Sequence, residues 1–376
     1  MADQKSVYEE IFASIKSKLD DPKIIYTLHD KFEDFPTLAS DVESIDQALD
    51  GGLPSGKIIE IFGPEAGGKT TTALHFIAAA QKRGSIVYFI DAEHALDPQY
   101  AGRIGIDFSK LMFSQPDTGE QALETIRIIC ESTEEIKLKR SRDFDTLIVV
   151  DSVPALIPKE IFTIYEKDGL ESSNALGAAA RMFASKLPMI VNKASKAGVT
   201  IAFINQVRDK IGVTWGATTT TPGGRAMKFF ASLRIKVNRI GYYERAGERA
   251  GIRVQMIPVK SKQFPIFNRV ADFIIGPNGI DAFASLIEVA IKKKVVIKKG
   301  AWYTFGDTRC QGQVNFEDEL KKIPGITDKL REALKAVGGQ TTQIELKPVA
   351  KPAPAPAPAV PPQPLSAAKN IRTIGQ

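Results

Sequence analysis

Cysteine, histidine and tryptophan are scarce in this chain, and long hydrophobic runs are absent. Its 376 residues include two cysteines, three histidines and two tryptophans. Cys130 and Cys310 are far apart and belong to no Cys-x-x-Cys or Cys/His cluster, so we expect reduced, structural thiols and neither a disulfide framework nor a zinc site. No apolar run is long enough to span a bilayer, and the polar residues 1–6 are unlike a signal peptide. We therefore expect no membrane partner and a cytoplasmic location.

The apolar content, by contrast, is ample for a large core. Hydrophobic residues make up 43% of the chain, and this length allows one large α/β domain with smaller pieces. The net charge of +6 and the isoelectric point near 9.0 fit a polyanionic partner without identifying one.

The most informative motif is Gly-Pro-Glu-Ala-Gly-Gly-Lys-Thr at residues 63–70, which fills every fixed position of G-x-x-x-x-G-K-[ST]. An apolar run at residues 58–62 predicts a buried strand before it, and residues 70–83 have the apolar spacing of a helix after it. In this context the backbone N–H groups and the helix N-terminus bind phosphates, while Lys69 adds a charge and the Thr70 hydroxyl can ligate Mg²⁺. We predict a nucleotide site rather than a chance glycine-rich turn.

Two further strands deliver carboxylates to the same expected edge of a sheet. The run at residues 147–150 ends in Asp151, which alone would suggest a turn but beside this loop predicts a Mg²⁺ ligand opposite Thr70. The run at residues 86–90 leads to Glu93, the best placed general base or water-orienting group.

The segment after Glu93 offers groups for the base of a nucleotide. Tyr100 has an aromatic face for adenine, and Asp97 either bonds an exocyclic amine or caps the helix that starts at Pro98. We expect His94 to be a packed structural residue.

The alternation of β-type and helical runs predicts an α/β fold with a mostly parallel central sheet. The strands are expected at residues 58–62, 86–90, 147–150, 200–204, 233–237 and 252–257. We predict four parts. The first is an N-terminal oligomerisation arm (1–35) with an amphipathic helix around Val7, Ile11, Ile15 and Leu19 and a strand at 24–28, and the second is a core with the nucleotide site (36–280). A small α/β C-terminal lobe (281–338) with the basic runs 292–294 and 298–299 follows, and then a disordered tail rich in proline and alanine (339–376).

Several long segments together resemble the bacterial RecA recombinase family. They include the loop beginning Gly-Pro-Glu, Phe-Ile-Asp-Ala-Glu-His-Ala-Leu-Asp at 89–97, Val-Val-Asp-Ser at 149–152, Phe-Ile-Asn-Gln at 203–206 and Gly-Ala-Trp-Tyr at 300–303. The resemblance covers residues 40–338 and implies a RecA-type P-loop ATPase core. It implies a helical filament of many copies on single-stranded DNA, pairing with homologous double-stranded DNA, strand exchange, DNA-stimulated hydrolysis of ATP with Mg²⁺, and stimulated self-cleavage of an SOS-type repressor.

The resemblance also implies roles for individual residues. It gives catalytic roles to Lys69, Glu93, Lys260, Lys262 and Gln206: the two later lysines reach a neighbour's γ-phosphate, and Gln206 senses the γ-phosphate. It assigns Asp97 and Tyr100 to adenine, and Thr70 and Asp151 to the metal. The implied phosphate-binding residues are Gly63, Pro64, Glu65, Ala66, Gly67, Gly68, Lys69, Thr70 and Thr71.

Two DNA-binding loops follow from the same resemblance, the first at residues 159–174 ahead of a helix at 177–186 and the second at residues 211–224. Threonine hydroxyls and backbone amides suit phosphate contacts, and Trp215 can stack on bases, although a plain flexible linker explains the second loop equally well. The implied DNA-binding residues are Arg181, Arg208, Lys210, Ile211, Gly212, Trp215, Thr219, Gly223 and Gly224.

Departures from the family pattern leave alternatives open. Trp215, Pro222 and Arg225 replace the usual residues, and an insertion at residues 133–142 lengthens a helix-to-strand connection. The tail is basic, whereas RecA proteins often end in an acidic tail that restrains duplex binding. A ring-forming helicase of the same fold, or a filament protein that binds ATP and DNA without turnover, are the alternatives. Lys69, Thr70, Glu93 and Asp151 argue against the second.

Overall fold

The computed structural model describes residues 2–20, 36–141, 143–168, 177–209, 219–245 and 247–338. The predicted strand at 24–28 and tail from residue 339 lie outside the described residues. Within the described ranges, no helix is long and apolar enough to cross a bilayer.

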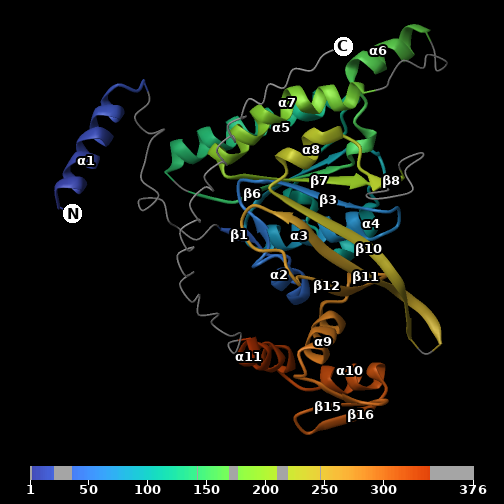
Figure 1. Cartoon of the computed structure of the whole chain (residues 1–376). Coiled ribbons are helices and arrows are strands. Elements are labelled where there is room, and N and C mark those ends of the chain that lie inside the picture. Colours follow the sequence, from blue (N-terminus) through green and yellow to red (C-terminus); the bar gives the residue numbers. More distant parts are fainter. Residues whose placement is uncertain are drawn as a thin grey trace, which may run out of the picture.

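In the part of the chain that the structure describes, nine strands form the central sheet (Figure 1), in the order β13-β12-β11-β10-β3-β7-β6-β4-β5. They are β3 (Ile58–Gly63), β4 (Ile86–Asp91), β5 (Leu111–Ser114), β6 (Thr146–Asp151), β7 (Val199–Gln206), β10 (Leu233–Arg245), β11 (Glu248–Ser261), β12 (Ala271–Gly276) and β13 (Gly279–Ile280). Neighbouring strands from β10 to β5 are parallel, which confirms a mostly parallel sheet. The inner strands are apolar and buried on both faces because helices cover both sides.

The strand expected at residues 252–257 lies in the antiparallel part of the sheet. These residues belong to β11, which is antiparallel to both β10 and β12. β10 and β11 form one long hairpin whose outer halves are polar and partly exposed, so the sequence pattern revealed only their buried halves. Two residues separate the strands, too few for the crossover that a parallel pair requires.

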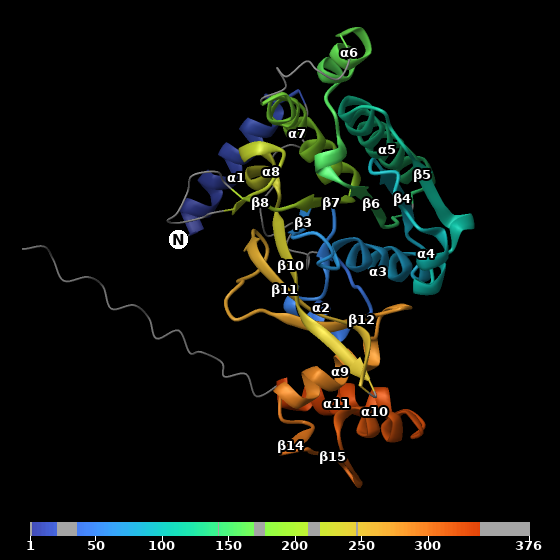
Figure 2. The same ribbon diagram turned by 90° about the vertical axis from the view of Figure 1, so that its right-hand side faces the viewer.

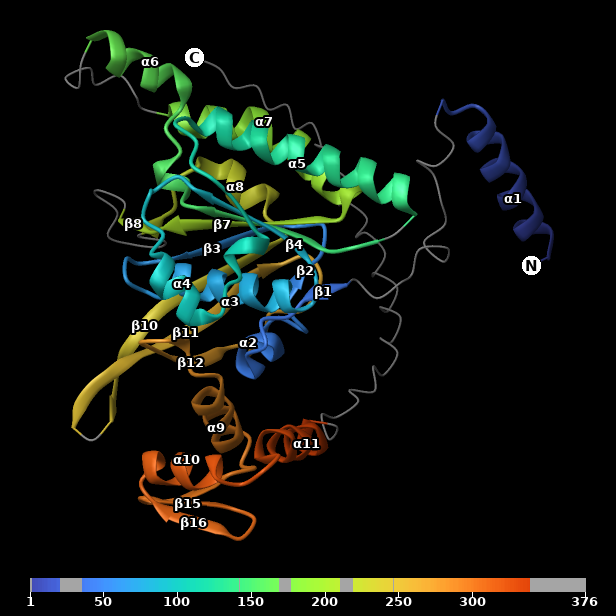
Figure 3. The same ribbon diagram turned by 180° about the vertical axis from the view of Figure 1, so that it is seen from behind.

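Helices form a layer on each face of the sheet (Figures 2 and 3). One layer contains α2 (Glu43–Ala48), α3 (Lys69–Lys82) and α4 (Pro98–Ile104), and the other contains α5 (Gly119–Arg140), α7 (Ala178–Ala197) and α8 (Gly224–Phe230). Each face has its own apolar core, with Phe76 and Phe89 on the α3 side and Phe183 and Phe203 on the α5/α7 side. Shorter elements are β1 (Thr37–Leu38), β2 (Leu53–Pro54) and the 3₁₀ turns η3 (Phe108–Lys110) and η4 (Val153–Ala155).

The insertion noted at residues 133–142 extends a helix instead of a loop. α5 begins with a capping box between Thr118 and Gln121 and continues without a break to Arg140. Pairs such as Glu135 with Lys139 along the added turns support helix rather than coil.

A small C-terminal lobe has a core of its own. It consists of α9 (Ala282–Lys292), β14 (Ile297–Lys299), β15 (Trp302–Phe305), β16 (Thr308–Gln311), α10 (Gln313–Lys321) and α11 (Ile326–Gly338). The long β10–β11 hairpin reaches this lobe (Figure 1). There the Tyr243 hydroxyl donates to Glu317 at 3.5 Å, and Arg253 pairs with Glu288 at 2.7 Å. The lobe is therefore fixed to the core by the hairpin as well as by the chain.

Two helices project from the body. α1 (Ala2–Ser17) is the predicted amphipathic helix, although it ends before Leu19, and its apolar residues Val7 and Ile11 are 50% and 55% exposed. α6 (Lys159–Asp168) occupies the first part of the expected first DNA loop, so residues 159–168 form a helix, and their contact with DNA stays a prediction. Residues 169–176 lie outside the described part.

Candidate nucleotide-binding site

The glycine-rich loop joins the carboxyl end of β3 to the amino end of α3, which confirms the predicted strand, loop and helix. Two glycines are required by its geometry. A Cβ on Gly63 would lie 1.9 Å from the Val237 carbonyl oxygen. Gly68 precedes the helix with φ +91°, and a Cβ there would lie 2.6 Å from Ile275.

A pocket of about 360 Å³ opens beside this loop. It is lined by Ala66, Gly67, Gly68, Lys69, Thr70, Thr71, Tyr100, Ile252 and Ile275. The Tyr100 hydroxyl lies 3.0 Å from the Thr71 hydroxyl, so the predicted aromatic residue reaches the loop. Sequence reasoning missed Ile252 and Ile275, because they come from the antiparallel strands β11 and β12. The pocket combines an amide-rich phosphate cradle with an apolar and aromatic wall, as a nucleotide requires.

Lys69 lies at the base of the pocket. Its ammonium donates to the Pro64 carbonyl oxygen at 2.7 Å. Burial lowers the pKa of Lys69, while the carboxylates of Asp151, Glu93 and Glu65 oppose that change. Three carboxylates therefore act on this ammonium and oppose the effect of its burial.

Thr70 and Asp151 are brought together as predicted. The Thr70 hydroxyl donates to an Asp151 carboxylate oxygen at 2.7 Å. Burial raises the pKa of Asp151 to about 6, and the bond from Thr70 opposes the rise. Within the described residues no group of three His, Cys, Asp or Glu side chains can hold a metal. One carboxylate and one hydroxyl suit Mg²⁺, which completes its shell with water and phosphate oxygens.

Glu93 lies next to this pair and is exposed. Its carboxylate accepts from the Ser152 hydroxyl and, at 3.4 Å, from the Gln206 side-chain amide. Asp91 holds the surrounding loop by accepting from the Ala95 and Leu96 amides at 3.2 and 3.3 Å. Sequence reasoning missed Asp91 and Ser152, whose only signal was their place at strand ends.

Two other expectations for this segment have clear outcomes. Asp97 caps α4, since its carboxylate accepts from the amides of Gln99 and Tyr100 at 2.8 and 3.2 Å. The capping alternative is therefore confirmed, and contact with adenine stays a prediction. His94 is exposed with φ +55°, so its assignment as a packed residue was wrong.

Gln206 ends β7 and begins the second loop. The loop starts and closes as a short ribbon, in which β8 (Arg208–Asp209) pairs with β9 (Thr219–Thr220). Lys210, Ile211, Gly212 and Trp215 lie outside the described residues. Next to Gln206, the Asn205 amide donates to the buried Glu60 at 2.8 Å and to the Pro222 carbonyl at 3.0 Å. Sequence reasoning missed this anchor of the loop's exit.

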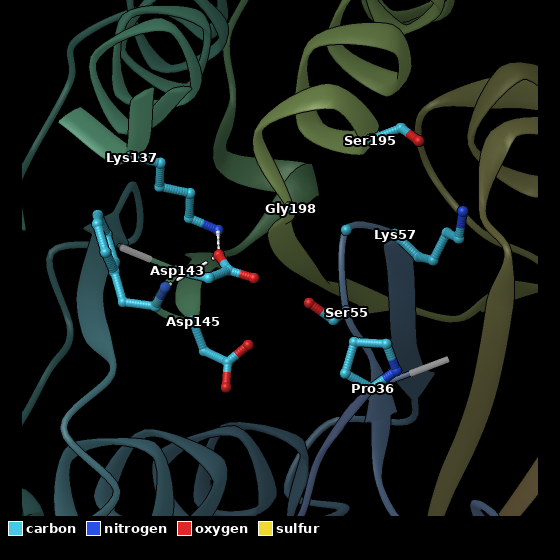
Figure 4. Close-up of a pocket in the computed structure, with 10 residues that line it drawn as sticks. Pro36, Ser55, Lys57, Lys137, Asp143, Asp145, Ser195 and Gly198 are labelled. Carbon is cyan, nitrogen blue, oxygen red and sulfur yellow. Dashed lines mark hydrogen bonds and ion pairs between the residues drawn. The ribbon is translucent and has the colours of Figure 1, made fainter. Parts of the chain in front are cut away.

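A second pocket, of about 490 Å³, lies at the opposite edge of the sheet, where the parallel strands begin (Figure 4). Lys57 and Lys137 lie on opposite sides of it, and Lys137 pairs with Asp143 at 2.7 Å. It has no glycine loop, and its two lysines are balanced by Asp143 and Asp145. This balance makes it a poor phosphate site.

The comparisons with known proteins agree with the nucleotide-binding site described above. The family model for the RecA N-terminal domain matches residues 7–281, and that for the RecA C-terminal domain matches residues 284–337. The chain belongs to the RecA family. Relatives called Protein RecA include those of Rubrobacter xylanophilus (44% identical, covering 82% of this chain and 87% of the relative), Aquifex aeolicus (44%, 77% and 80%) and Nostoc sp. (40%, 84% and 84%). RecA proteins are DNA-dependent ATPases of recombination and repair. This chain is accordingly an ATP- and DNA-binding protein that self-associates.

Three residues that the RecA resemblance singled out are not brought to the nucleotide pocket. Lys260 is level with Glu60 in the sheet, and its ammonium lies against α8, on the face opposite α3. Lys262 follows β11, with its amide bonded to the Ser232 carbonyl. Arg181 on α7 pairs with Glu160 of α6 at 2.7 Å, so it lies beside the segment that was expected to form the first DNA loop. Neither lysine can serve the pocket of its own chain.

Proposed function

We propose that this RecA-family chain assembles on single-stranded DNA as an ATP-bound helical filament, pairs that strand with a homologous duplex and exchanges strands. Hydrolysis of ATP then releases the DNA. The observation that carries this proposal is the contact of Glu93 with both Ser152, beside the Thr70–Asp151 pair, and Gln206, at the root of the second loop. One carboxylate thus touches both the phosphate site and the element expected to bind DNA.

The phosphate groups would lie against the backbone amides of residues 66–71 at the start of α3. Lys69 leaves the Pro64 carbonyl to meet the terminal phosphates. Thr70 and Asp151 hold Mg²⁺, which when bound offsets the charge that develops on the phosphates.

Glu93 orients and deprotonates the attacking water, because it is the exposed carboxylate next to the metal pair. Gln206 bonds the γ-phosphate in exchange for its long contact with Glu93. That exchange passes the state of the nucleotide to the loop that follows. Tyr100 stacks on adenine, and Asp97 fixes Tyr100 by capping α4.

Self-association draws on apolar surfaces that the single chain leaves exposed. α1 presents Val7 and Ile11, and the edge strand β5 presents Met112 and Phe113, which are 48% and 47% exposed. An amphipathic helix and an unpaired edge strand are surfaces that a second copy can cover. The arm of one subunit therefore docks on the core of the next.

Contacts with DNA come from both lobes. In the core they are made by Arg181 and the second loop, through Arg208, Lys210, Ile211, Gly212, Trp215, Thr219, Gly223 and Gly224. In the C-terminal lobe, Lys298 and Lys299 are exposed on β14, and Arg309 lies over the exposed Trp302 ring at 4.9 Å. The exposed cations suit the phosphates of the homologous duplex. We place the protein in the cytoplasm, where the filament also stimulates an SOS-type repressor to cleave itself.

The deciding experiment is ATP hydrolysis measured with and without single-stranded DNA. Lys69→Ala should abolish ATP binding, and Glu93→Gln should keep ATP and DNA binding while losing turnover, so that its filaments persist on DNA. Glu135→Gln, which changes an exposed carboxylate on α5, is the control and should behave as the unchanged chain. Hydrolysis that DNA does not stimulate would contradict the proposed function, and full turnover by Glu93→Gln would remove that residue from catalysis.

A further inference from the structure

Lys260 makes an unusually complete set of contacts with the end of α8. Its ammonium donates to the carbonyl oxygens of Lys228, Phe229 and Ala231 at 2.8, 2.9 and 2.7 Å. The last carbonyls of a helix lack intrahelical partners and form the negative end of its dipole. An ammonium has three N–H donors. All three donors of Lys260 are therefore used by one helix end.

The other end of α8 is joined to the second loop. Gly223 precedes the helix, and the Pro222 carbonyl accepts from Asn205. Gly224 packs so closely that a Cβ would lie 2.8 Å from the Ala180 Cβ. α8 has only seven residues, so it connects the loop's exit to Lys260 over less than two full turns. A displacement of one end of such a short helix also displaces the other end.

The charges around Lys260 favour transfer of its ammonium from the carbonyl oxygens of α8 to an anion. Burial lowers the pKa of Lys260, and Lys262 and Arg234 add to the change. Glu60, the nearby buried carboxylate, is already paired with Arg234. Lys262 differs from Lys260, since its ammonium has no hydrogen-bond or ion-pair partner among the described residues.

We infer that Lys260 is a positioning residue of α8, and that the end of this helix and the terminal phosphate of a neighbouring subunit's nucleotide compete for its ammonium. The second half of this inference rests on the proposed filament and on the reach to a neighbour's γ-phosphate that the RecA resemblance implies for Lys260. Because three carbonyls use its three donors, Lys260 must leave at least one of them to bind a phosphate. Its departure loosens the last turn of α8 and, through it, the exit of the DNA loop.

The first test uses the full chain without nucleotide or DNA, and measures hydrogen exchange of the α8 amides by mass spectrometry. Lys260→Met keeps an unbranched side chain only one atom shorter but removes its donors, and should speed exchange at the end of α8 roughly tenfold. Lys260→Arg should restore much of the protection. Lys262→Met, with the same loss of charge two residues away, should leave α8 unchanged. Equal exchange in Lys260→Met and Lys262→Met would overturn the positioning role.

The second test adds a non-hydrolysable ATP analogue and single-stranded DNA. The difference in α8 exchange between the unchanged chain and Lys260→Met should shrink in filaments, because the unchanged lysine has moved to the neighbour. An undiminished difference would overturn the competition. If Lys260→Met does not assemble alone, isotope-labelled variant subunits diluted into unlabelled filaments give the same comparison. Failure of the unchanged chain to assemble would refute the proposed function instead, and leave the first test intact.

Discussion

Two carboxylates in the nucleotide site differ in their surroundings, and so in what they can do. Asp151 ends β6, is buried, and accepts a hydrogen bond from Thr70. Glu93 follows the neighbouring strand β4 and is exposed. A buried carboxylate paired with a hydroxyl is suited to hold a cation, whereas an exposed one can meet a water molecule. The position of each residue at its strand end, rather than its chemical type, separates their roles.

His75 provides a prediction for stability at low pH. Burial lowers the pKa of His75 to about 4, and its Nε2 accepts from the Ile280 amide at 2.7 Å, so the folded chain requires the neutral ring. Below the ordinary value of 6.5 the unfolded chain takes up a proton that the folded chain refuses. This contribution of His75 to the free energy of unfolding is fully present above pH 6.5. As the pH falls to about 4, about 3 kcal/mol is lost. Urea unfolding across this range measures it.

His75→Gln is the matched variant, since glutamine can accept the same amide without titrating. The difference in unfolding free energy between the two chains should therefore change with pH, whatever the other groups contribute. Parallel pH profiles for the two chains would contradict a neutral, buried His75.

The predictable part of the site was the part encoded locally. The loop at residues 63–70 fixes its own strand, turn and helix, and Asp151 was found because its apolar strand is contiguous in sequence. The contacts of Glu93 with Ser152 and of Asn205 with Glu60 join residues 59 and 145 positions apart. No periodicity reports such pairs, because they exist only after β3, β4, β6 and β7 have paired.

At the scale of elements, two hairpins determine what surrounds the nucleotide. The β10–β11 hairpin brings Ile252 to the nucleotide pocket and holds the C-terminal lobe through Arg253. The β8–β9 ribbon closes the second loop directly after Gln206. The sequence predicted both regions but neither hairpin. The polar outer halves of β10 and β11 hid the first hairpin, and the glycine- and threonine-rich run of the second loop is compatible with a linker as well as with a ribbon.

This ribbon leads to a prediction for the second loop. If Trp215 stacks on bases, its fluorescence should change when single-stranded DNA is added with ATP, and much less with ADP. Trp215→Ala should weaken DNA binding by about 1 to 3 kcal/mol, the scale of one stacked base. The measurement is fluorescence titration in a Trp302→Phe background, which removes the other tryptophan.

Gln206→Ala is the companion variant, because Gln206 stands between Glu93 and the loop. Its Trp215 signal should lose the dependence on ATP while DNA still binds. Tight DNA binding with an unaltered Trp215 signal would show that the loop is a linker, and would assign DNA recognition to the first loop and the basic C-terminal lobe.

At the scale of the whole molecule, the two halves of the proposed catalytic site lie on different surfaces. The P-loop pocket opens where β3 ends and α3 begins, whereas Lys260 lies on the α8 face of the sheet, level with the middle of β3. When two different surfaces form one site only between neighbouring subunits, the subunits assemble head to tail. Such an assembly continues as a helix unless its rotation closes a ring, so a shared site and a filament have one geometric origin.

Mixing two inactive variants tests this arrangement. Lys69→Ala lacks a working phosphate site but keeps its lysines, and Lys260→Ala/Lys262→Ala keeps its phosphate site but lacks the lysines. In filaments mixed in equal amounts, about a quarter of the interfaces join an intact pocket to intact lysines, so roughly that fraction of DNA-stimulated hydrolysis should return. In the control, the double-lysine variant also carries Lys69→Ala and is mixed with Lys69→Ala subunits. This mixture should show no rescue, because none of its pockets is intact. Energy transfer between differently labelled subunits shows whether mixed filaments form. If they form and still hydrolyse no more ATP than the separate variants, Lys260 and Lys262 do not act across the interface, and their role is confined to their own chain.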